Sequence, residues 1–276
     1  MIELIQSARP AIFIGLFLVF ACWEVLSPRR SRGHPLLRRW LGNIGILAVG
    51  TVLARLILPL APVSVAVWAD QAGVGILNAV KIQPVVAGIF AFLILDLLIY
   101  GQHVAFHRIP VLWRIHRMHH SDLDLDTSSG LRFHPLEIIF SLVLKMAAVA
   151  VLGAPVLSVL LFEVVLNATS MFNHSSINIP ANVDRILRRV VVTPDMHRVH
   201  HSVYRDETDS NFGFNIPWWD RALGTYKDQP RDGHGEMQLG LPDLRDQRCA
   251  GLINLLMQPF VKIIPASRSA TREPEN

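Results

Sequence analysis

The sequence predicts an all-α integral membrane helical bundle of about three full spans plus a hairpin, with a histidine-rich helical cap on the cytoplasmic face. The first observation behind this prediction is composition: 51% of the residues are hydrophobic and the mean hydropathy is +0.36, more apolar than an ordinary soluble domain. The second is that apolar residues gather in runs long enough to cross a bilayer. The third is a set of histidine clusters placed directly beyond those runs.

The first span is expected over residues 11–28. A retained anchor is favoured over a cleaved signal peptide, because the run lacks a basic leading region and a small-residue cleavage site. Five arginines follow within residues 27–39, and the positive-inside rule places that loop in the cytoplasm. Two flanking spans make membrane topology a better explanation of these charges than nucleic-acid binding.

Residues 41–61 are expected to form the second span, residues 62–82 a loop on the far side, and residues 84–100 the third span. The third span carries Asp96, two helical turns before His103 and therefore on the same face. Asp96 is either a hydrogen-bond acceptor that fixes the tautomer of a metal ligand or a buried acid with an unrelated partner.

Residues 136–172 form a second long apolar block, broken around Gly153. We expect a hairpin with both ends on the cytoplasmic side, whether or not it crosses completely. The acidic stretch 121–130 that precedes it is expected to be a solvated loop.

The later part of the chain is more polar. A capped helix is expected to start at Thr193-Pro194-Asp195, and a short helix with Trp218 and Trp219 to end at Gly224. Residues 251–264 are too short to span comfortably and predict an interfacial helix. Residues 1–265 are interpreted as one domain with a histidine-motif core at 96–226, and residues 266–276 as a disordered tail.

Three histidine clusters carry the chemistry. HxxxH occurs at His103 and His107, and HxxHH occurs twice, with helical spacing that puts the members of each cluster on one face. Imidazole is the commonest metal ligand among side chains near neutral pH, so the clusters predict a metal site. The eight predicted ligands are His103, His107, His116, His119, His120, His197, His200 and His201. His174 is a further candidate because it follows the hairpin, and His134 is a weaker one.

Eight imidazoles indicate more than one ion, since a single zinc site takes about four ligands. The zinc-hydrolase pattern HExxH and the Glu-x-x-His pattern of carboxylate di-iron bundles are both missing from the sequence. The ligand type leaves iron, zinc, copper and nickel open. Iron is favoured if the chemistry involves oxygen, because zinc does not change its redox state.

The motifs HVAFH, HRMHH, RFHPLE, NHSSINIP and TPDMHRVHHS…NFGFNIPWWDRALGTY resemble those of the fatty acid hydroxylase / sterol desaturase superfamily, over residues 96–226. The resemblance implies a membrane-embedded non-haem di-iron oxygenase that uses O2 to hydroxylate or desaturate a lipid C–H bond. It assigns the metal ligation to the same eight histidines, with no catalytic side chain beyond the metal ligands. Some members have a further HxxxH after the hairpin, and here His174 takes its first position while Asn178 takes the second.

The expected cofactor is a pair of iron ions, with zinc as an alternative in the purified protein. No Rossmann or CxxC pattern occurs, so electrons are expected from an external donor, either cytochrome b5-like or a ferredoxin with its reductase. The expected partners are therefore a lipid substrate, the membrane and this donor, with no nucleic acid. The expected membrane is the inner membrane of a bacterium or the endoplasmic reticulum of a eukaryote.

Two other classes of function are open at this point. One is a non-redox zinc-binding membrane protein, such as a hydrolase or a metal sensor or carrier. The other is a structural membrane protein that has lost catalysis, which the intact histidine clusters disfavour.

Overall fold

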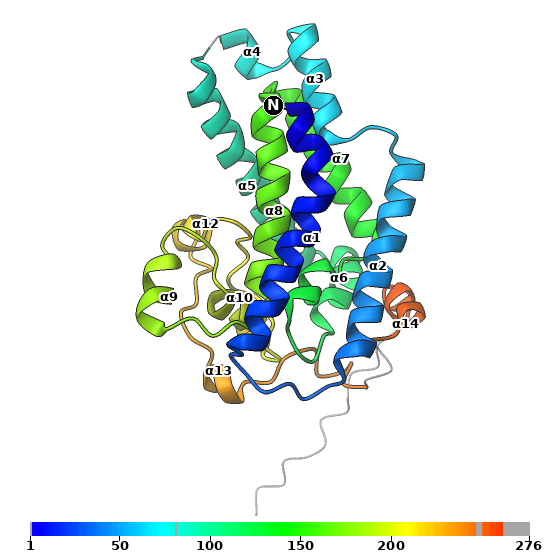
Figure 1. Ribbon diagram of the computed structural model, residues 1–276, viewed down its shortest axis with the longest axis vertical. Helices are drawn as coiled ribbons and strands as arrows, with labels where there is room; N and C mark the ends of the chain where they lie inside the picture. The colour runs from blue at the N-terminus through cyan, green and yellow to red at the C-terminus, as the bar shows by residue number, and fades with distance from the viewer. Residues whose placement is uncertain (1, 81, 247–249, 262–276) are drawn as a thin grey trace, which may run out of the picture.

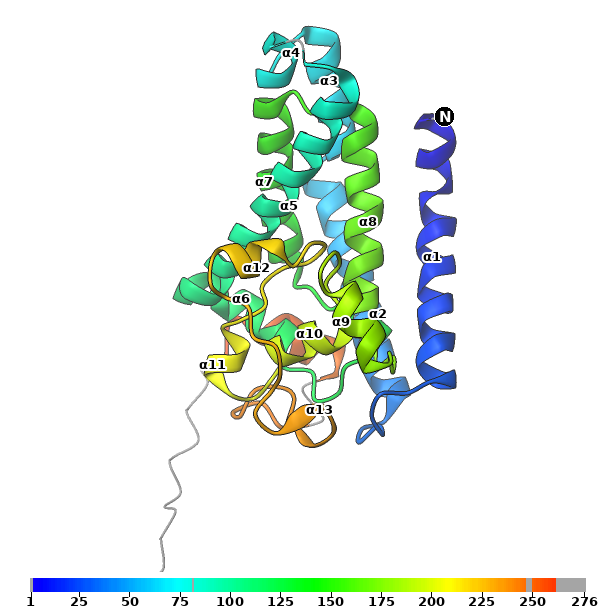
Figure 2. The same cartoon turned by 90° about the vertical axis from the view of Figure 1, so that its left-hand side faces the viewer.

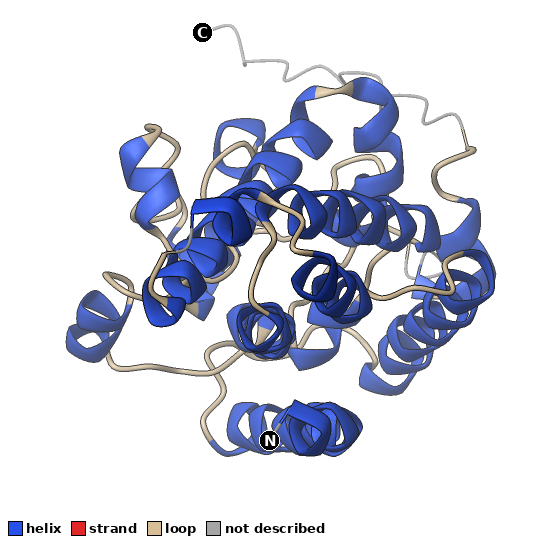
Figure 3. Ribbon diagram, turned by 90° about the horizontal axis from the view of Figure 1, so that it is seen from above, coloured by secondary structure: helices blue, strands red, loops and turns tan. Residues whose placement is uncertain are grey.

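A computed structural model describes residues 2–80, 82–246 and 250–261. Within those residues the chain is helix and loop, and the β contacts are two isolated bridges, Pro28 with Ile177 and Ser202 with Leu239. Figure 3 shows no strand in the described part. The all-α prediction is confirmed.

Five helical stretches are long and apolar enough to cross a membrane, which makes this a multi-pass membrane protein. One of these stretches, Leu36 to Val80, begins with the helix α2 and extends beyond its end. The long helices are α1 (Ile2–Leu26), α2 (Leu36–Ile57), α5 (Pro84–Arg108), α7 (Pro135–Leu152) and α8 (Val156–His174). They stand side by side, with α1 at the edge of the bundle (Figures 1 and 2).

Helices α7 and α8 are the two halves of the predicted hairpin. They have 18 and 19 residues, which corresponds to about 27 and 28 Å of helix and nearly matches the hydrocarbon thickness of a bilayer. The helix α7 ends at Gly153, whose φ of 62° lies in the left-handed region that glycine adopts without strain. The hairpin is thus long enough to cross.

The prediction of a loop over residues 62–82 was wrong. This stretch contains α3 (Pro62–Ala72) and α4 (Ile76–Val80). Val63, Ala66 and Ala69 fall three residues apart on one side of α3, where they are buried, and α3 packs against α7 and α8. Small apolar residues at helical spacing make this far-side segment part of the bundle core.

The remaining helices gather at the end of the bundle where α5 and α8 finish (Figure 1). They are α6 (Pro110–His120), η1 (Thr127–Leu131), α9 (Ala181–Leu187), α10 (Pro194–His200), α11 (Arg205–Thr208), α12 (Trp218–Ala222), α13 (Gly233–Glu236) and α14 (Leu252–Met257). The arginine-rich loop lies at the same end, because Arg29 forms an ion pair with Asp195 on α10 at 3.1 Å. The loop and the histidines therefore share one side of the bundle, while the cytoplasmic identity of that side stays a prediction.

The prediction of a solvated acidic loop at 121–130 was also wrong. Asp122 and Asp126 are buried, and Arg39 of α2 pairs with them at 2.7 and 2.5 Å. Burial alone would raise the pKa of Asp122, but the guanidinium groups of Arg39 and Arg132 outweigh it and hold that pKa well below its usual range. The compensating Arg39 lies more than eighty residues earlier, so the local sequence did not reveal it.

The helix α14 packs against α2, where Leu255 joins Ile46 and Met118 in a small buried cluster. Ile253 and Phe260 on the same segment are 76% and 61% exposed. An interfacial position for this helix stays a prediction, and the predicted tail at 266–276 lies outside the described residues.

Candidate metal centre

The first two histidines lie in the last turns of α5. Pro84 opens this helix, and the side chain of Gln83 caps it by accepting the N–H of Val86 at 2.9 Å. His103 and His107 are four residues apart and therefore share a face. Both rings are buried, so the end of this apolar helix places two imidazoles inside the protein.

The first HxxHH motif forms the end of α6. Pro110 occupies the first turn of this helix, where a proline is tolerated, and Ser121 follows its last residue. His116, His119 and His120 are all buried, with 1% of each residue exposed.

The second HxxHH motif begins in α10. The hydroxyl of Thr193 accepts the N–H of Met196 at 3.4 Å, and Pro194 opens the helix, so the predicted helix start is confirmed. His197 and His200 belong to α10 and His201 caps its end, and all three rings are buried.

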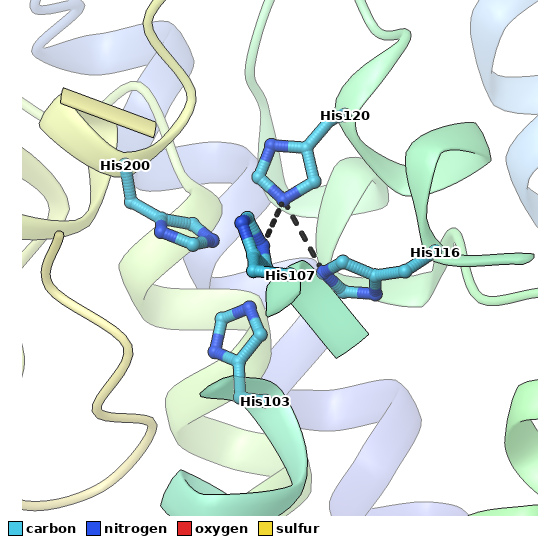
Figure 4. A group of neighbouring side chains, drawn as sticks. All are labelled: His103, His107, His116, His120 and His200. Carbon is cyan, nitrogen blue, oxygen red and sulfur yellow. Dashed lines mark hydrogen bonds between the residues drawn. The ribbon is translucent and has the colours of Figure 1, made fainter. Parts of the chain in front are cut away.

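These helices bring nine histidines together in two adjoining groups. Within each group the ligand nitrogens all lie within 4.8 Å of one another. The first group is His103, His107, His116, His120 and His200, and the second group is His119, His174, His197 and His201. Figure 4 shows the first group, with rings from α5, α6 and α10 turned toward a common centre. His120 and His201, one from each group, stack with ring centroids 4.5 Å apart.

His174 is the member that links α8 to the second group. Its Nε2 lies 2.9 Å from Nε2 of His119, 3.1 Å from that of His197 and 3.2 Å from that of His201. Its Nδ1 donates to the carbonyl of Ser170 at 2.6 Å, which directs Nε2 toward the other three rings. The structure therefore places this sequence candidate within the cluster.

Each HxxHH motif supplies both groups. His116 and His120, four residues apart, join the first group, while His119 between them joins the second. His197 and His201 join the second group, while His200 joins the first. Consecutive residues on a helix point about 100° apart, so two adjacent histidines face different centres.

Most rings are held from outside through Nδ1. His103 donates to the carbonyl of Phe212 at 2.7 Å, and His200 to that of Ser210 at 2.7 Å. His119 donates to the carbonyl of Arg132 at 3.0 Å. Such outer acceptors fix the tautomer and leave Nε2 as a lone pair pointing inward, as in metal-bound histidines generally.

Two histidines of the first group donate instead to carboxylates. His107 bonds Asp209 at 3.2 Å and His116 bonds Glu137 at 2.8 Å. Sequence reasoning missed both acids as functional residues. Glu137 was visible within the RFHPLE motif, whereas Asp209 follows the last HxxHH without any distinguishing pattern.

The nitrogen geometry fits bound metal. Nε2 of His103 and Nε2 of His200 are buried with no hydrogen-bond partner within the described protein. Such buried, unsatisfied polar atoms are costly unless something binds them. Nε2 of His120 lies 3.1 Å from that of His107 and 3.2 Å from that of His116. Two imidazole nitrogens bound about 2.1 Å from one ion would be about 3.0 Å apart at a right angle, so these spacings match edges of a coordination polyhedron.

The rings are also in the protonation state that ligation needs. Burial, and then the neighbouring histidines, lower the pKa of His119, His120, His197 and His201 well below the ordinary value. Burial lowers the pKa of His200 to about 3. These imidazoles are therefore neutral at physiological pH and able to bind a cation.

Three weaker candidates lie away from the cluster. His134 caps α7, accepting the N–H of Leu136 at Nδ1 and donating from Nε2 to the carbonyl of Leu256, so both nitrogens are used. Asn178 is exposed, and its backbone bonds Ser27. His134 lies outside both histidine groups, and the contact of Asn178 involves only its backbone, so ligation by either residue stays a prediction.

Asp96 accepts the indole N–H of Trp219 at 2.8 Å. The tautomer of His103 is fixed by the Phe212 carbonyl, so of the two alternatives for Asp96 the unrelated partner holds. The loop that carries Phe212 is held in turn by Asp220, which accepts the N–H groups of Phe212 and Gly213 at 2.7 and 2.9 Å.

Residues 88–225, half of the chain, match the protein family described as fatty acid hydroxylase. The chain is 29% identical over 162 residues to the ornithine lipid hydroxylase OlsE of Rhizobium tropici, which covers 59% of this chain and 46% of that protein. It is 26% identical over 228 residues to the cholesterol 25-hydroxylase of Rattus norvegicus, and the aligned region covers 79% of this chain and 74% of that protein. It is 28% identical over 142 residues to the alkylglycerol monooxygenase of Homo sapiens, and the aligned region covers 50% of this chain and 30% of that protein.

The matched part of the chain thus spans less than half the length of the first and third of these relatives. No solved structure is significantly similar to the chain.

Proposed function

Because this chain belongs to the fatty acid hydroxylase family, we propose that it is a membrane-bound lipid hydroxylase whose buried histidines hold two iron ions. The observation that carries the proposal is the division of nine buried histidines into two adjoining groups of converging ligand nitrogens. The similar proteins are named as hydroxylases or a monooxygenase of different lipids, which supports a lipid substrate without selecting one.

Iron is proposed rather than zinc on two grounds. The first group offers five imidazoles, one more than the four ligands of a typical zinc site. Insertion of oxygen into an unactivated C–H bond also requires a metal that changes oxidation state, which bound iron supplies and zinc does not. Hydroxylation consumes the substrate R–H, O2, two electrons and two protons and yields R–OH and water. The two electrons come from an external donor, either cytochrome b5-like or a ferredoxin with its reductase.

The surrounding side chains keep the site apolar. The ring of Phe133 stacks on His119 at 4.6 Å between centroids, and Phe212 lies 5.0 Å from His107. Phe214 lies 5.2 Å from His103. These aromatic rings exclude water from the inner nitrogens and keep the imidazoles neutral.

The apolar surroundings of the histidines continue into the helical bundle. Phe214 belongs to the same hydrophobic core as Leu95 and Ile99 of α5 and Phe162 of α8. That core therefore connects the histidines with the membrane-spanning helices. We propose that the acyl or sterol part of the substrate approaches from the bundle, on the cytoplasmic side of a bacterial inner membrane or of the endoplasmic reticulum.

The proposal is tested first by metal analysis of the purified full-length chain. We expect about two iron atoms per chain. His119→Ala should remove at least one of them, whereas His34→Ala should leave iron content unchanged, because His34 pairs with Asp124 outside both groups. Zinc at full occupancy, with iron failing to replace it, would instead favour the non-redox alternative.

The reaction is tested in cells that express the chain or its His119→Ala variant under 18O2. We expect a lipid that gains one labelled oxygen only with the unaltered chain. A lipid that loses two hydrogens instead would identify desaturation. A product formed equally under argon would contradict the oxygenase proposal.

A further inference from the structure

A groove on the flank of the molecule is lined by four arginines. It lies between the turn after α9 and the short helix α12, and its lining residues are Arg185, Arg188, Arg189, Arg221, Tyr226 and Asp228. Figure 1 shows α9 and α12 beside the bundle, at the half that holds the histidines. None of these residues belongs to the two histidine groups.

One arginine of the groove is fixed in place. Arg188 is 4% exposed and forms ion pairs with Asp184 and, at 2.9 Å, with Asp228. Its Nη1 also donates to the backbone carbonyl of Asp228 at 3.0 Å. The guanidinium of Arg188 is therefore held in a fixed position in the groove, and its charge is offset by two carboxylates.

Two further arginines have no acidic partner. Arg185 and Arg189 are exposed, and their side chains make no ion pair or hydrogen bond with any part of the chain that the structure describes. Arg185 lies on α9 and Arg189 in the turn that follows it, and both line the same groove, so two uncompensated positive charges repel each other there. An anion between them would relieve this repulsion, and guanidinium groups bind phosphate with paired N–H donors.

The fourth arginine comes from α12. The guanidinium of Arg221 lies 3.8 Å from the ring centre of Tyr226 and donates to the carbonyl of Arg188 at 3.2 Å. The indole of Trp218 donates to the carbonyl of Arg189 at 2.7 Å. The two walls of the groove are thus joined by hydrogen bonds, so it is formed before any ligand arrives.

The groove lies beside α5, one of the helices long and apolar enough to span a membrane. Trp219 of α12 bonds Asp96, which is twelve residues, or about 18 Å of helix, inside the end of the membrane-spanning α5. Apolar side chains beside the arginines remain exposed: Ile186 by 66%, Val190 by 65%, Leu223 by 59% and Trp218 by 48%. Arginine beside exposed tryptophan and aliphatic residues is typical of the boundary between headgroups and acyl chains.

We propose that this groove binds the phosphate of an anionic membrane lipid, with the exposed apolar residues lying against its acyl chains. Four arginines against two acids favour an anionic over a zwitterionic headgroup. The apolar rim favours a lipid in the bilayer over a free phosphate ion. Binding at this surface requires neither metal nor turnover, so it stands or falls independently of the hydroxylase proposal.

The test is a titration of the detergent-purified full chain with phosphatidylglycerol or phosphatidylcholine, followed by native mass spectrometry. We expect selective binding of phosphatidylglycerol. Arg185→Gln combined with Arg189→Gln should weaken that binding roughly 30-fold, on the scale of about 1 kcal/mol for each basic residue near an anionic surface. The matched control combines Arg38→Gln with Arg55→Gln, two exposed arginines elsewhere, and should bind phosphatidylglycerol as the unaltered chain does.

An unchanged melting temperature of both double variants checks that they fold, and none of these arginines belongs to the histidine groups. Equal binding of the two lipids, or an unchanged affinity after the Arg185 and Arg189 changes, would overturn the proposal. So would full displacement of phosphatidylglycerol by inorganic phosphate at a similar concentration, which would identify a free-anion site. Binding only of an acidic protein partner, with no lipid adduct, would also overturn it.

Discussion

The two histidine groups differ in what holds their rings from outside. In the first group, His107 and His116 donate to the carboxylates of Asp209 and Glu137. In the second group, the outer acceptors of His119 and His174 are backbone carbonyls. A carboxylate acceptor makes an imidazole a more basic ligand than a carbonyl does. The first group also has five members against four, so we expect the two metal positions to be inequivalent.

The largest effect should come from removing one ligand from each group. His174→Ala leaves the second group with three imidazoles, whereas His200→Ala leaves the first group with four. We expect His174→Ala to reduce iron from two atoms per chain to about one, and His200→Ala to retain more iron. Both should lower lipid oxidation by a factor on the order of 10³, because the ligands act as a unit.

Iron content by mass spectrometry, measured alongside lipid oxidation, checks this difference. Equal iron loss in both variants would show that the number of imidazoles does not distinguish the groups. Full activity in either variant would remove that histidine from the site.

Acid should destabilise the metal-free protein, because both groups bury neutral imidazoles. The folded-state pKa of His200 is about 3, below the unfolded value near 6.5. The unfolded chain therefore binds a proton first as the pH falls, and stability that is complete above pH 6.5 is lost progressively toward pH 3. This one ring contributes on the order of 5 kcal/mol over that window.

Melting temperatures between pH 7 and pH 4, with and without iron, measure this effect. Iron should protect, because protons must compete with the metal for each ring. Two separate steps of iron release on acidification would sharpen the distinction between the groups, and we expect the four-membered group to release its ion first. A metal-free melting temperature independent of pH would contradict neutral buried rings.

A smaller effect should follow from Glu137→Gln, which removes the carboxylate behind His116 but keeps an acceptor oxygen. We expect iron affinity at one of the two positions to fall about tenfold, the lower end of the range for outer partners of metal ligands. Competition with a chelator measures the two affinities. Asp124→Asn is the matched control, since that acid pairs with His34 and not with either group.

An equal loss at both iron positions after Glu137→Gln would contradict the assignment of this acid to the first group. Loss after Asp124→Asn would show that any acid at this end of the protein matters.

The sequence was sufficient to predict the helical class and eight of the nine histidines that converge in the two groups, because both predictions depend on local periodicity. The partition of the ligands into groups was also encoded there. In His116-x-x-His119-His120 the first and last rings lie about 40° apart around the helix, while the two adjacent rings lie about 100° apart. The expectation that all three histidines of HxxHH share one helix face concealed their division between the two groups.

Other features depend on contacts between distant segments. The buried state of Asp122 depends on Arg39. The role of Asp209 depends on its approach to His107 across about a hundred residues. The arginine-lined groove needs α12 to lie against the turn after α9. Such pairings follow from the packed fold and leave no periodic pattern in the sequence.

The crossed supply of ligands has a consequence for assembly. An ion held by His116 and His120 would immobilise the same helix that offers His119 to the neighbouring position, and α10 would be restrained in the same way. Binding of the first ion would therefore already order the helices that hold the second ion, so the second ion would cost less conformational entropy. We therefore expect an ion in the first group to strengthen binding of the second, so that the four-membered group should bind iron more tightly once its neighbour is occupied.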